Sequence, residues 1–192
     1  MAFREIVTVG DPVLRERARE VTAAELRSPE VQALIDDMIE TKRAANGAGI
    51  AANQVGETLR IAIVEVEPGN PRYPYKPAVP LTVIVNPVLE PLGEETAEIN
   101  EGCLSVPGLR GTVERRMAIR ARYLDRDGEE HLEVRRGLTA GTFQHEVDHL
   151  DGILFLDRVR DPSTFATWEQ FDRFHRAAFE ARARELVERF ES

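Results

Sequence analysis

Two histidines one helical turn apart place the strongest constraint on how this chain can fold. They occur in the segment Gln144-His145-Glu146-Val147-Asp148-His149, where a glutamate follows the first histidine. On a helix, residues four positions apart share one face, so both imidazoles can reach the same divalent ion. Glu146 then lies beside the metal axis, where its carboxylate can handle the protons of a bound water. The fold must therefore bring a third ligand to this face.

The only cysteine of the chain, Cys103, is the candidate third ligand. It occurs in Glu101-Gly102-Cys103-Leu104-Ser105, far from the histidines in the sequence. Other interpretations stay open at this point: two histidines can share an exposed helix face by chance, and a single buried cysteine is most often a small apolar filler. A lone cysteine excludes an intrachain disulfide, which fits a reducing cytosol and frees the thiol for chemistry.

A run of small residues, Gly47-Ala48-Gly49-Ile50-Ala51-Ala52-Asn53-Gln54, is the third informative segment. Its simplest interpretation is a helix cap followed by a tight loop. The glycines on either side of Ala48 also leave the backbone uncovered, so that another chain can pair with it. Gln54 could direct an amide donor at a developing oxyanion. A nucleotide-binding loop is not favoured, because no Lys-Ser/Thr follows and no strand precedes the run.

Composition indicates an ordinary globular protein. The 192 residues, 42% hydrophobic and 31% charged, are expected to form one domain, 1–192. The net charge of −9 argues against general nucleic-acid binding, because little would drive counterion release from phosphates. The sequence lacks an apolar core of signal-peptide length at its start and any apolar run long enough to span a membrane, so we expect a cytoplasmic protein.

Capping signals predict three main helices. Ser28-Pro29 is expected to start an N-terminal helix that ends at Asn46-Gly47. Gly137 should open the metal-binding helix, and Asp151-Gly152 should close it. Asp161-Pro162 is expected to begin a long C-terminal helix.

Strands are predicted at 59–66, 81–85, 112–123 and 129–135, the last two joined by a hairpin turn at Asp127-Gly128. With the helices, this order indicates an α+β fold with mostly antiparallel sheet around a central metal-binding helix.

Three other groups of residues carry expectations of their own. The proline-rich segment 67–80 is expected to be a surface excursion with polyproline character. Basic pairs such as Arg115-Arg116 are expected on the solvated face of a strand. The C-terminal aromatics are expected to pack rather than to bind a ligand; they are Phe165, Trp168, Phe171 and Phe174.

The three motifs together resemble those of the peptide deformylases. They stand in the family's order and at similar spacing, and the resemblance runs from about Pro12 to Val159, with a C-terminus like that of the bacterial and organellar type. Ordinary zinc proteases with His-Glu-x-x-His do not take a cysteine from Glu-Gly-Cys-Leu-Ser as a third ligand. Ala48 departs from the pattern, because a β-branched residue is usual there, and the segment before Leu81 looks longer than in compact members. Neither departure touches the chemistry.

The resemblance implies one divalent metal ion held by Cys103, His145 and His149, with water in the fourth position. Fe(II) is the ion such enzymes usually work with, and Zn(II), Ni(II) or Co(II) also suit these ligands.

The implied reaction removes the formyl group from N-formylmethionyl nascent peptides, which such an enzyme could meet at the ribosome, and releases formate. Glu146 would accept the proton of the attacking water and then protonate the departing amine. The Gln54 amide and the Leu104 backbone N–H would stabilise the oxyanion. No nucleic-acid or membrane partner is implied.

The substrate would bind as an extended strand along Ala48, Gly49 and Ile50 and near Gly102. Helix geometry independently indicates a methionine pocket on the His145 face, and the other interpretation of these residues is plain core packing. The candidates are Leu138, Gly141 and Thr142 on the helix and Ile99 on a strand that approaches the metal.

Two alternatives belong to other functional classes. A metalloprotease or another metal-dependent amidohydrolase would be favoured if Cys103 were dispensable and a downstream glutamate ligated the metal. A non-catalytic member that binds metal or nascent chains is disfavoured by Glu146 and Gln54, because a binding module needs neither.

Overall fold

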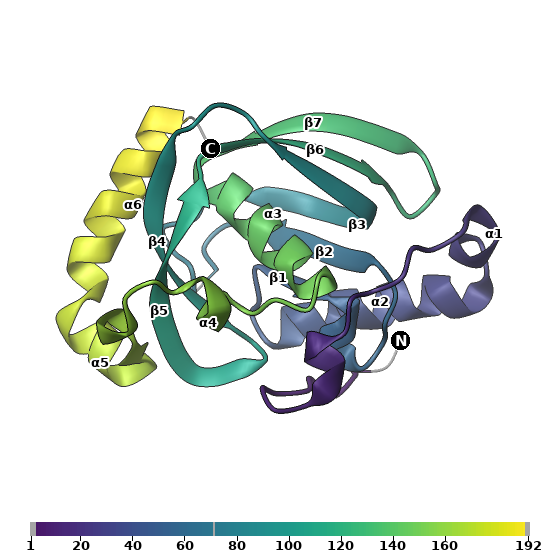
Figure 1. Cartoon of the computed structure of the whole chain (residues 1–192), viewed down its shortest axis with the longest axis horizontal. Helices are drawn as coiled ribbons and strands as arrows, with labels where there is room; N and C mark the ends of the chain where they lie inside the picture. Colours follow the sequence, from purple (N-terminus) through teal and green to yellow (C-terminus); the bar gives the residue numbers. More distant parts are fainter. Residues whose placement is uncertain (1–2, 71, 191–192) are drawn as a thin grey trace.

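Two antiparallel sheets and a helix packed against both of them form the centre of the fold (Figure 1). The computed structural model describes residues 3–70 and 72–190. The central helix, α3 (Gly137–Leu150), carries the two histidines. The predicted α+β class, the antiparallel sheets and the central helix are therefore confirmed.

The larger sheet has five strands in the order β1-β2-β3-β6-β7, and the smaller has three in the order β4-β5-β8. The larger sheet consists of β1 (Gly49–Ala51), β2 (Ile61–Val66), β3 (Val79–Pro91), β6 (Ala118–Leu124) and β7 (Glu130–Arg136). The smaller sheet consists of β4 (Thr96–Cys103), β5 (Val106–Arg116) and β8 (Ala166–Thr167). Short helical turns join these elements: η1 (Pro12–Arg15), α1 (Ala23–Leu26), η2 (Ala52–Val55), α4 (Phe155–Arg158) and η3 (Pro162–Thr164).

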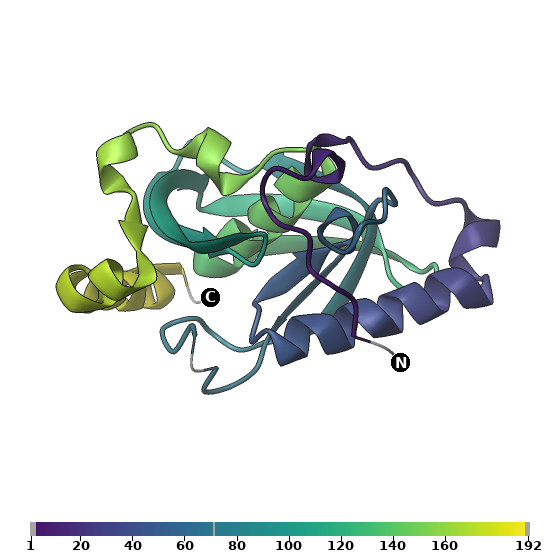
Figure 2. The same cartoon turned by 90° about the horizontal axis from the view of Figure 1, so that it is seen from below.

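Strand β2 is buried on both faces because a helix covers each side of the larger sheet. Ile61 and Ile63 belong to the apolar cluster under α2 (Pro29–Ala44), whereas Ala62 and Val64 belong to the cluster that contains the apolar side chains of α3. Figure 2 shows α2 running along one face of the sheet with α3 on the other. This two-sided burial explains why residues 61–64 are all apolar and do not alternate with polar residues.

The predicted start and end of α2 and the predicted turn between β6 and β7 are confirmed. The Ser28 hydroxyl accepts a hydrogen bond from the Val31 N–H, and Pro29 occupies the first turn of α2. Asn46 has a φ of 52°, and it reverses the chain after α2. At Gly128 the φ is 85°, as the turn between β6 and β7 requires.

The predicted strand 112–123 is wrong in one respect, because it joins two strands of different sheets. The chain leaves the smaller sheet after Arg116 and enters the larger sheet at Ala118. Met117, fully buried between them, donates its N–H to the Glu95 carbonyl and accepts from the Gly137 N–H. A crossing made in the middle of a β-prone run leaves no signal in local composition.

The long C-terminal helix exists, but it starts later than predicted. Asp161 caps only the short turn η3, after which β8 pairs with β5. Helix α5 (Trp168–Phe174) and the longer α6 (Arg176–Phe190) follow, separated at His175. Of the aromatic residues, Phe171 is buried but Phe174 is 63% exposed, so their predicted packing holds only in part.

The proline-rich segment is not purely a surface excursion. Tyr73 and Tyr75 are buried, and the Tyr75 ring packs edge-on against Phe179 of α6 at 4.9 Å between centroids.

None of the helices within residues 3–70 and 72–190 is long and apolar enough to cross a membrane.

Candidate active site

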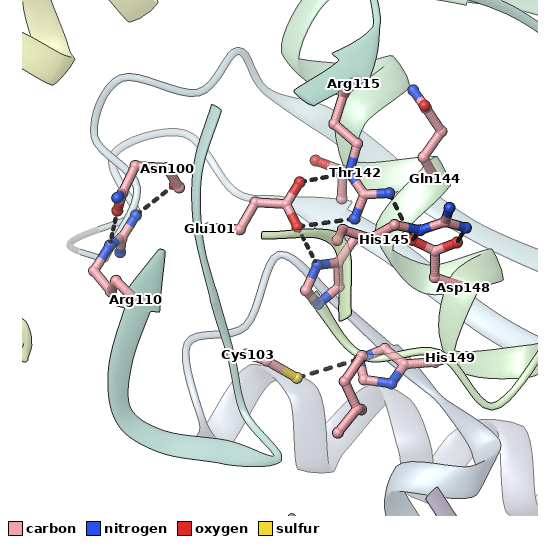
Figure 3. A network of polar contacts seen from close by, with 12 residues as sticks. Asn100, Glu101, Cys103, Arg110, Arg115, Thr142, Gln144, His145, Asp148 and His149 are labelled. Atoms are coloured by element: carbon pink, nitrogen blue, oxygen red, sulfur yellow. Dashed lines mark hydrogen bonds and ion pairs between the residues drawn. The ribbon is translucent and has the colours of Figure 1, made fainter. Parts of the chain in front are cut away.

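The end of β4 and the inner face of α3 bring three potential metal ligands together. One ligand atom from each of Cys103, His145 and His149 lies within 4.8 Å of the others, and the Cys103 Sγ is 3.2 Å from the His149 Nε2 (Figure 3). A thiolate and two imidazoles at this spacing suit a tetrahedral ion with one open position. The chemistry of these three side chains therefore fits a bound metal ion.

A buried carboxylate fixes the orientation of the first histidine. The Glu101 Oε2 lies 2.9 Å from the His145 Nδ1, which leaves the Nε2 free to face the metal position. Arg115 holds Glu101 from the other side through two hydrogen bonds of 2.7 and 3.0 Å. Burial alone would raise the pKa of Glu101, but Arg115 and His145 hold it well below its usual range. Glu101 is thus a charged acceptor for the imidazole N–H.

Arg115 also reaches the metal helix. It donates to the Asp148 carboxylate at 2.5 Å, and Arg158 donates to the same carboxylate at 2.7 Å. The Arg115 side chain is 4% exposed, so its predicted place on a solvated face is wrong. The partly exposed Arg116 next to it fits that prediction, because neighbouring residues of a strand point to opposite faces.

Gln144 attaches α3 to the end of β5. Its side-chain amide accepts from the Arg116 N–H at 3.1 Å and donates to the Arg116 carbonyl at 2.8 Å. The amide therefore pairs with the strand as a neighbouring strand would. The next residue along α3 is His145, the first of the two potential histidine ligands.

Glu146 is buried next to the metal triad without a fixed partner for one of its oxygens. Its Oε2 has no hydrogen-bond partner among the described residues, and burial raises the pKa of the carboxyl to about 7. Such a group can hold or release a proton near neutral pH. A Cβ at Gly49 would collide with this carboxyl group, so the glycine leaves the space that Glu146 occupies.

The run of small residues from Gly47 to Gln54 contacts both the strand that carries Cys103 and the helix that carries the histidines. The Gln54 Nε2 donates to the Cys103 Sγ at 3.4 Å and to the Ser105 hydroxyl at 3.1 Å, while its Oε1 accepts from the Ala51 N–H. Asn53 donates to the His149 carbonyl at 2.5 Å. The Gln54 amide donor thus lies next to Cys103, one of the three potential metal ligands.

One cavity unites most of the residues predicted for the substrate. Its walls include the following predicted residues: Ala48, Gly49, Gln54, Ile99, Gly102, Leu104, Leu138, Gly141 and Thr142. Ile50 does not line it, because its side chain is buried in the cluster under α2. The position next to Gly141 is occupied by Ile99, whose Cδ1 is 2.8 Å from where a Cβ at Gly141 would stand.

Sequence reasoning missed several residues of this cavity and of its support. The proline-rich segment supplies Tyr73, Tyr75 and Lys76, and the Lys76 Nζ donates to the Thr142 hydroxyl at 2.7 Å. The two tyrosines among the prolines were the only sequence signal that this segment could be partly buried. Glu101 stood inside a recognised motif, but nothing in its spacing indicated that it would hold His145.

Comparison with known proteins assigns the family. The family model described as polypeptide deformylase matches residues 3–165. This chain belongs to the peptide deformylase family. A peptide deformylase of Leptospira biflexa is 42% identical over 172 residues, which cover 90% of this chain and 96% of that protein. Peptide deformylase 1 of Prochlorococcus marinus is 45% identical over 166 residues, covering 86% and 85% of the two chains.

Solved structures agree with this assignment. A class I type b peptide deformylase from Acinetobacter baumannii with Met-Ala-Ser bound has a TM-score of 0.79 and 42% identity, covering 82% of this chain and 99% of that one. The enzyme from Thermotoga maritima has a TM-score of 0.73 and 34% identity, covering 84% and 100%. The chain is accordingly a hydrolase of a metal-dependent family that removes the N-formyl group from nascent peptides. This assignment is favoured over the metalloprotease alternative.

Proposed function

We propose that deformylation takes place in the cavity beside Cys103, His145 and His149, with Glu146 as the group that transfers protons. The observation that carries the proposal is the buried Glu146 carboxyl, which has an oxygen without a partner beside the three potential ligands. A bound ion would supply Lewis-acid polarisation of a water and of the formyl carbonyl. Glu146 takes the proton of the attacking water and returns it to the departing amine.

The proposed oxyanion donors are the Gln54 side-chain amide and the Leu104 backbone N–H. The position of the Gln54 amide at the Cys103 sulfur and the presence of Leu104 in the cavity wall support this assignment. The oxyanion forms as water adds to the formyl carbon, so donors that already point there lower the barrier to that step.

We further propose that the peptide binds as a strand beside β1, which is an edge strand of the larger sheet, with Gly102 on the other side. Ala48, Gly49 and Ile50 would contribute backbone groups, which fits the inward burial of the Ile50 side chain. The methionine side chain would lie among the walls formed by Ile99, Leu138, Gly141 and Thr142.

Formate release from formyl-Met-Ala-Ser by anaerobically prepared protein tests the function. Glu146→Gln should keep its metal and fold while turnover falls by about 10²- to 10⁴-fold, because the proton-transfer group is lost. Glu98→Gln, an exposed change on β4, is the matched control and should leave turnover unchanged. Comparable turnover by a metal-loaded Glu146→Gln variant would show that another base is used.

We propose Fe(II) as the working ion, held by Cys103, His145 and His149. The thiolate and two imidazoles support a soft or borderline divalent ion. Cys103→Ser, His145→Ala and His149→Ala should each lose metal on dialysis, as measured by elemental analysis. In air the Fe(II) form should lose activity while a Ni(II) form survives. Equal decay of both forms would count against iron, and stoichiometric metal in Cys103→Ser would remove Cys103 from the ligand set.

The whole chain is proposed to act as one catalytic domain in the cytoplasm, where formylated chains leave the ribosome. The net charge of −9 supports peptide rather than nucleic-acid recognition.

A further inference from the structure

A second hollow lies along a different face of α3 from the potential metal ligands. Its volume is about 590 Å³, and Gln144, Val147 and Asp148 of α3 contribute to its wall. Val147 and Asp148 follow Gln144 at three and four residues, so all three share one face of the helix. Further walls come from β3 and β5, which lie on either side of α3 in Figure 1. The described walls of this hollow and of the proposed active-site cavity have no residue in common.

Arginine side chains give this hollow a positive charge. Among the described residues that line it, three are acidic and six are arginines, namely Arg17, Arg60, Arg115, Arg116, Arg158 and Arg160. The whole chain has the opposite balance, with 34 acidic and 25 basic residues. The hollow is therefore a local positive region on a protein of net charge −9, and it attracts anions.

The carboxylates in the hollow leave hydrogen-bonding capacity on these arginines. Each of two aspartates is shared between two arginines; the groups are Arg17 and Arg60 with Asp151, and Arg115 and Arg158 with Asp148. Arg116 pairs with Glu94, which lies outside the hollow and whose side chain is 94% exposed. A guanidinium carries five N–H donors, so a shared carboxylate leaves donors for a further anion.

One wall of the hollow is apolar. Ile119 and Val147 belong to the apolar cluster around α3, and Leu89 packs against that cluster. Pro87 and Pro91 extend this wall along β3. Small-molecule sites commonly combine apolar walls with a few charged groups in a volume of about 300–1,000 Å³. The hollow has this combination, and most of its charged groups are cationic.

We propose that this hollow binds a small organic anion, in which an aromatic or aliphatic group carries a phosphate or a carboxylate. The apolar group packs against Leu89 and Ile119, and the acidic group binds to the guanidiniums of Arg116 and Arg160. Alternate residues of a strand point to the same side, and Arg160 pairs with Glu114, two residues before Arg116 on β5, at 3.1 Å. The two guanidiniums therefore lie on one side of the strand. This site is independent of the deformylase function proposed above.

Calorimetric titration of the metal-loaded protein with 1-naphthyl phosphate tests the site. Saturating Met-Ala-Ser is present throughout, so that the phosphate does not bind at the metal. Inorganic phosphate and 1-naphthol each supply one half of the ligand, and both should bind at least about tenfold more weakly than 1-naphthyl phosphate. Added salt should weaken the binding of 1-naphthyl phosphate, because its charged contacts lie partly in solvent.

Three variants locate the binding. Arg116→Met/Arg160→Met should weaken the binding of 1-naphthyl phosphate by at least about tenfold, because two charged contacts are lost. The matched control is Arg120→Met/Arg122→Met, which removes two exposed arginines of β6 outside the hollow and should change the affinity less than about twofold. Thr96→Glu adds a carboxylate to the wall without removing an ion pair, and it should also weaken the binding.

Other outcomes overturn the site. Undetectable binding does so, and so does equal affinity of wild type and Arg116→Met/Arg160→Met. If 1-naphthyl phosphate binds no more tightly than inorganic phosphate, the arginines attract anions in general and the apolar wall has no role. Urea unfolding of both double variants checks that a lost affinity is not a lost fold.

Discussion

At the scale of single residues, the absence of a side chain at Gly49 leaves room for the Glu146 carboxyl. A side chain at position 49 would overlap the Glu146 carboxyl, which is buried beside the three potential ligands. Position 49 lies in a β-strand and its φ is not positive, so alanine is compatible with the backbone there. The glycine is therefore required by the neighbouring carboxyl and not by the turn of the chain.

Gly49→Ala should accordingly reduce kcat by about 10²-fold while metal content stays at the wild-type level, because a displaced Glu146 can no longer reach the water. Formate release and elemental analysis on the same preparation measure both quantities. Combining it with Glu146→Gln should cost little more than Glu146→Gln alone, since both changes act on one carboxyl. Fully additive losses would show that the two residues act independently.

The grouping of the three potential ligands with Glu146 could be predicted from the sequence, because two of the ligands and Glu146 share one helix turn and the third lies in a short motif. Glu101 and Lys76 could not be assigned roles in that way. Glu101 meets His145 only because β4 passes beside α3, and Lys76 meets Thr142 only because the proline-rich segment folds back over the cavity. Such contacts depend on tertiary structure, and they produce no periodic pattern of residues in the sequence.

At the scale of elements, α3 is attached to the smaller sheet by an ion pair that lies almost entirely out of water. Arg115 of β5 bridges Glu101 of β4 and Asp148 of α3 (Figure 3). Burial of the two carboxylates is tolerated because the same guanidinium serves both. The bridge also supports His145 through Glu101, so one arginine contributes to the fold and to the site.

Arg115→Met should lower the free energy of unfolding by about 3–5 kcal/mol, because it leaves the buried Glu101 carboxylate without its arginine and leaves Asp148 with Arg158 alone. Urea unfolding at neutral pH measures the loss. Arg116→Met is the matched control: its guanidinium pairs with Glu94, whose side chain is 94% exposed, and the change should cost less than about 1 kcal/mol. Similar losses in the two variants would contradict the role given to Arg115.

At the scale of the whole molecule, a second buried ion cluster links the pH of the solution to stability. Glu65 of β2 accepts hydrogen bonds from Lys42 at 2.7 Å and from Arg43 at 2.8 and 3.0 Å, both at the end of α2. The Arg43 hydrogen bonds, opposed by burial and helped by Lys42, lower the pKa of Glu65 to about 2. The folded state therefore binds a proton at this site less readily than the unfolded chain does.

The stabilisation from Glu65 should be complete above about pH 5 and be lost as the pH falls toward 2. A pKa lowered from 4.5 to about 2 corresponds to about 3 kcal/mol between these limits. Urea unfolding across this range should show a steeper fall in wild type than in Glu65→Gln, which cannot ionise. Glu67→Gln, an exposed neighbour, should follow the wild-type curve. A Glu65→Gln curve as steep as that of wild type would contradict the assignment.

The overall class could be predicted because α2, α3 and the β6–β7 hairpin are marked by caps and turn residues that act locally. The crossing at Met117 and the late start of the C-terminal helix could not be predicted, because both are determined by which strands pair in the two sheets. Residues 166 and 167 become a strand through contact with β5 and not through their own propensity.

The position of the three ligands has a consequence for the motions of the molecule. Cys103 ends a strand of the smaller sheet, whereas both histidines lie on the helix that also packs against the larger one. An ion shared among them is a cross-link that closes the long loop of β5, β6 and β7, and its binding energy adds to folding energy. Chelation should therefore accelerate amide hydrogen exchange first along β4 and the start of β5, while α2 and the sheet face beneath it stay protected. A metal ion bound to these three residues would thus also stabilise the packing of α3 against the smaller sheet.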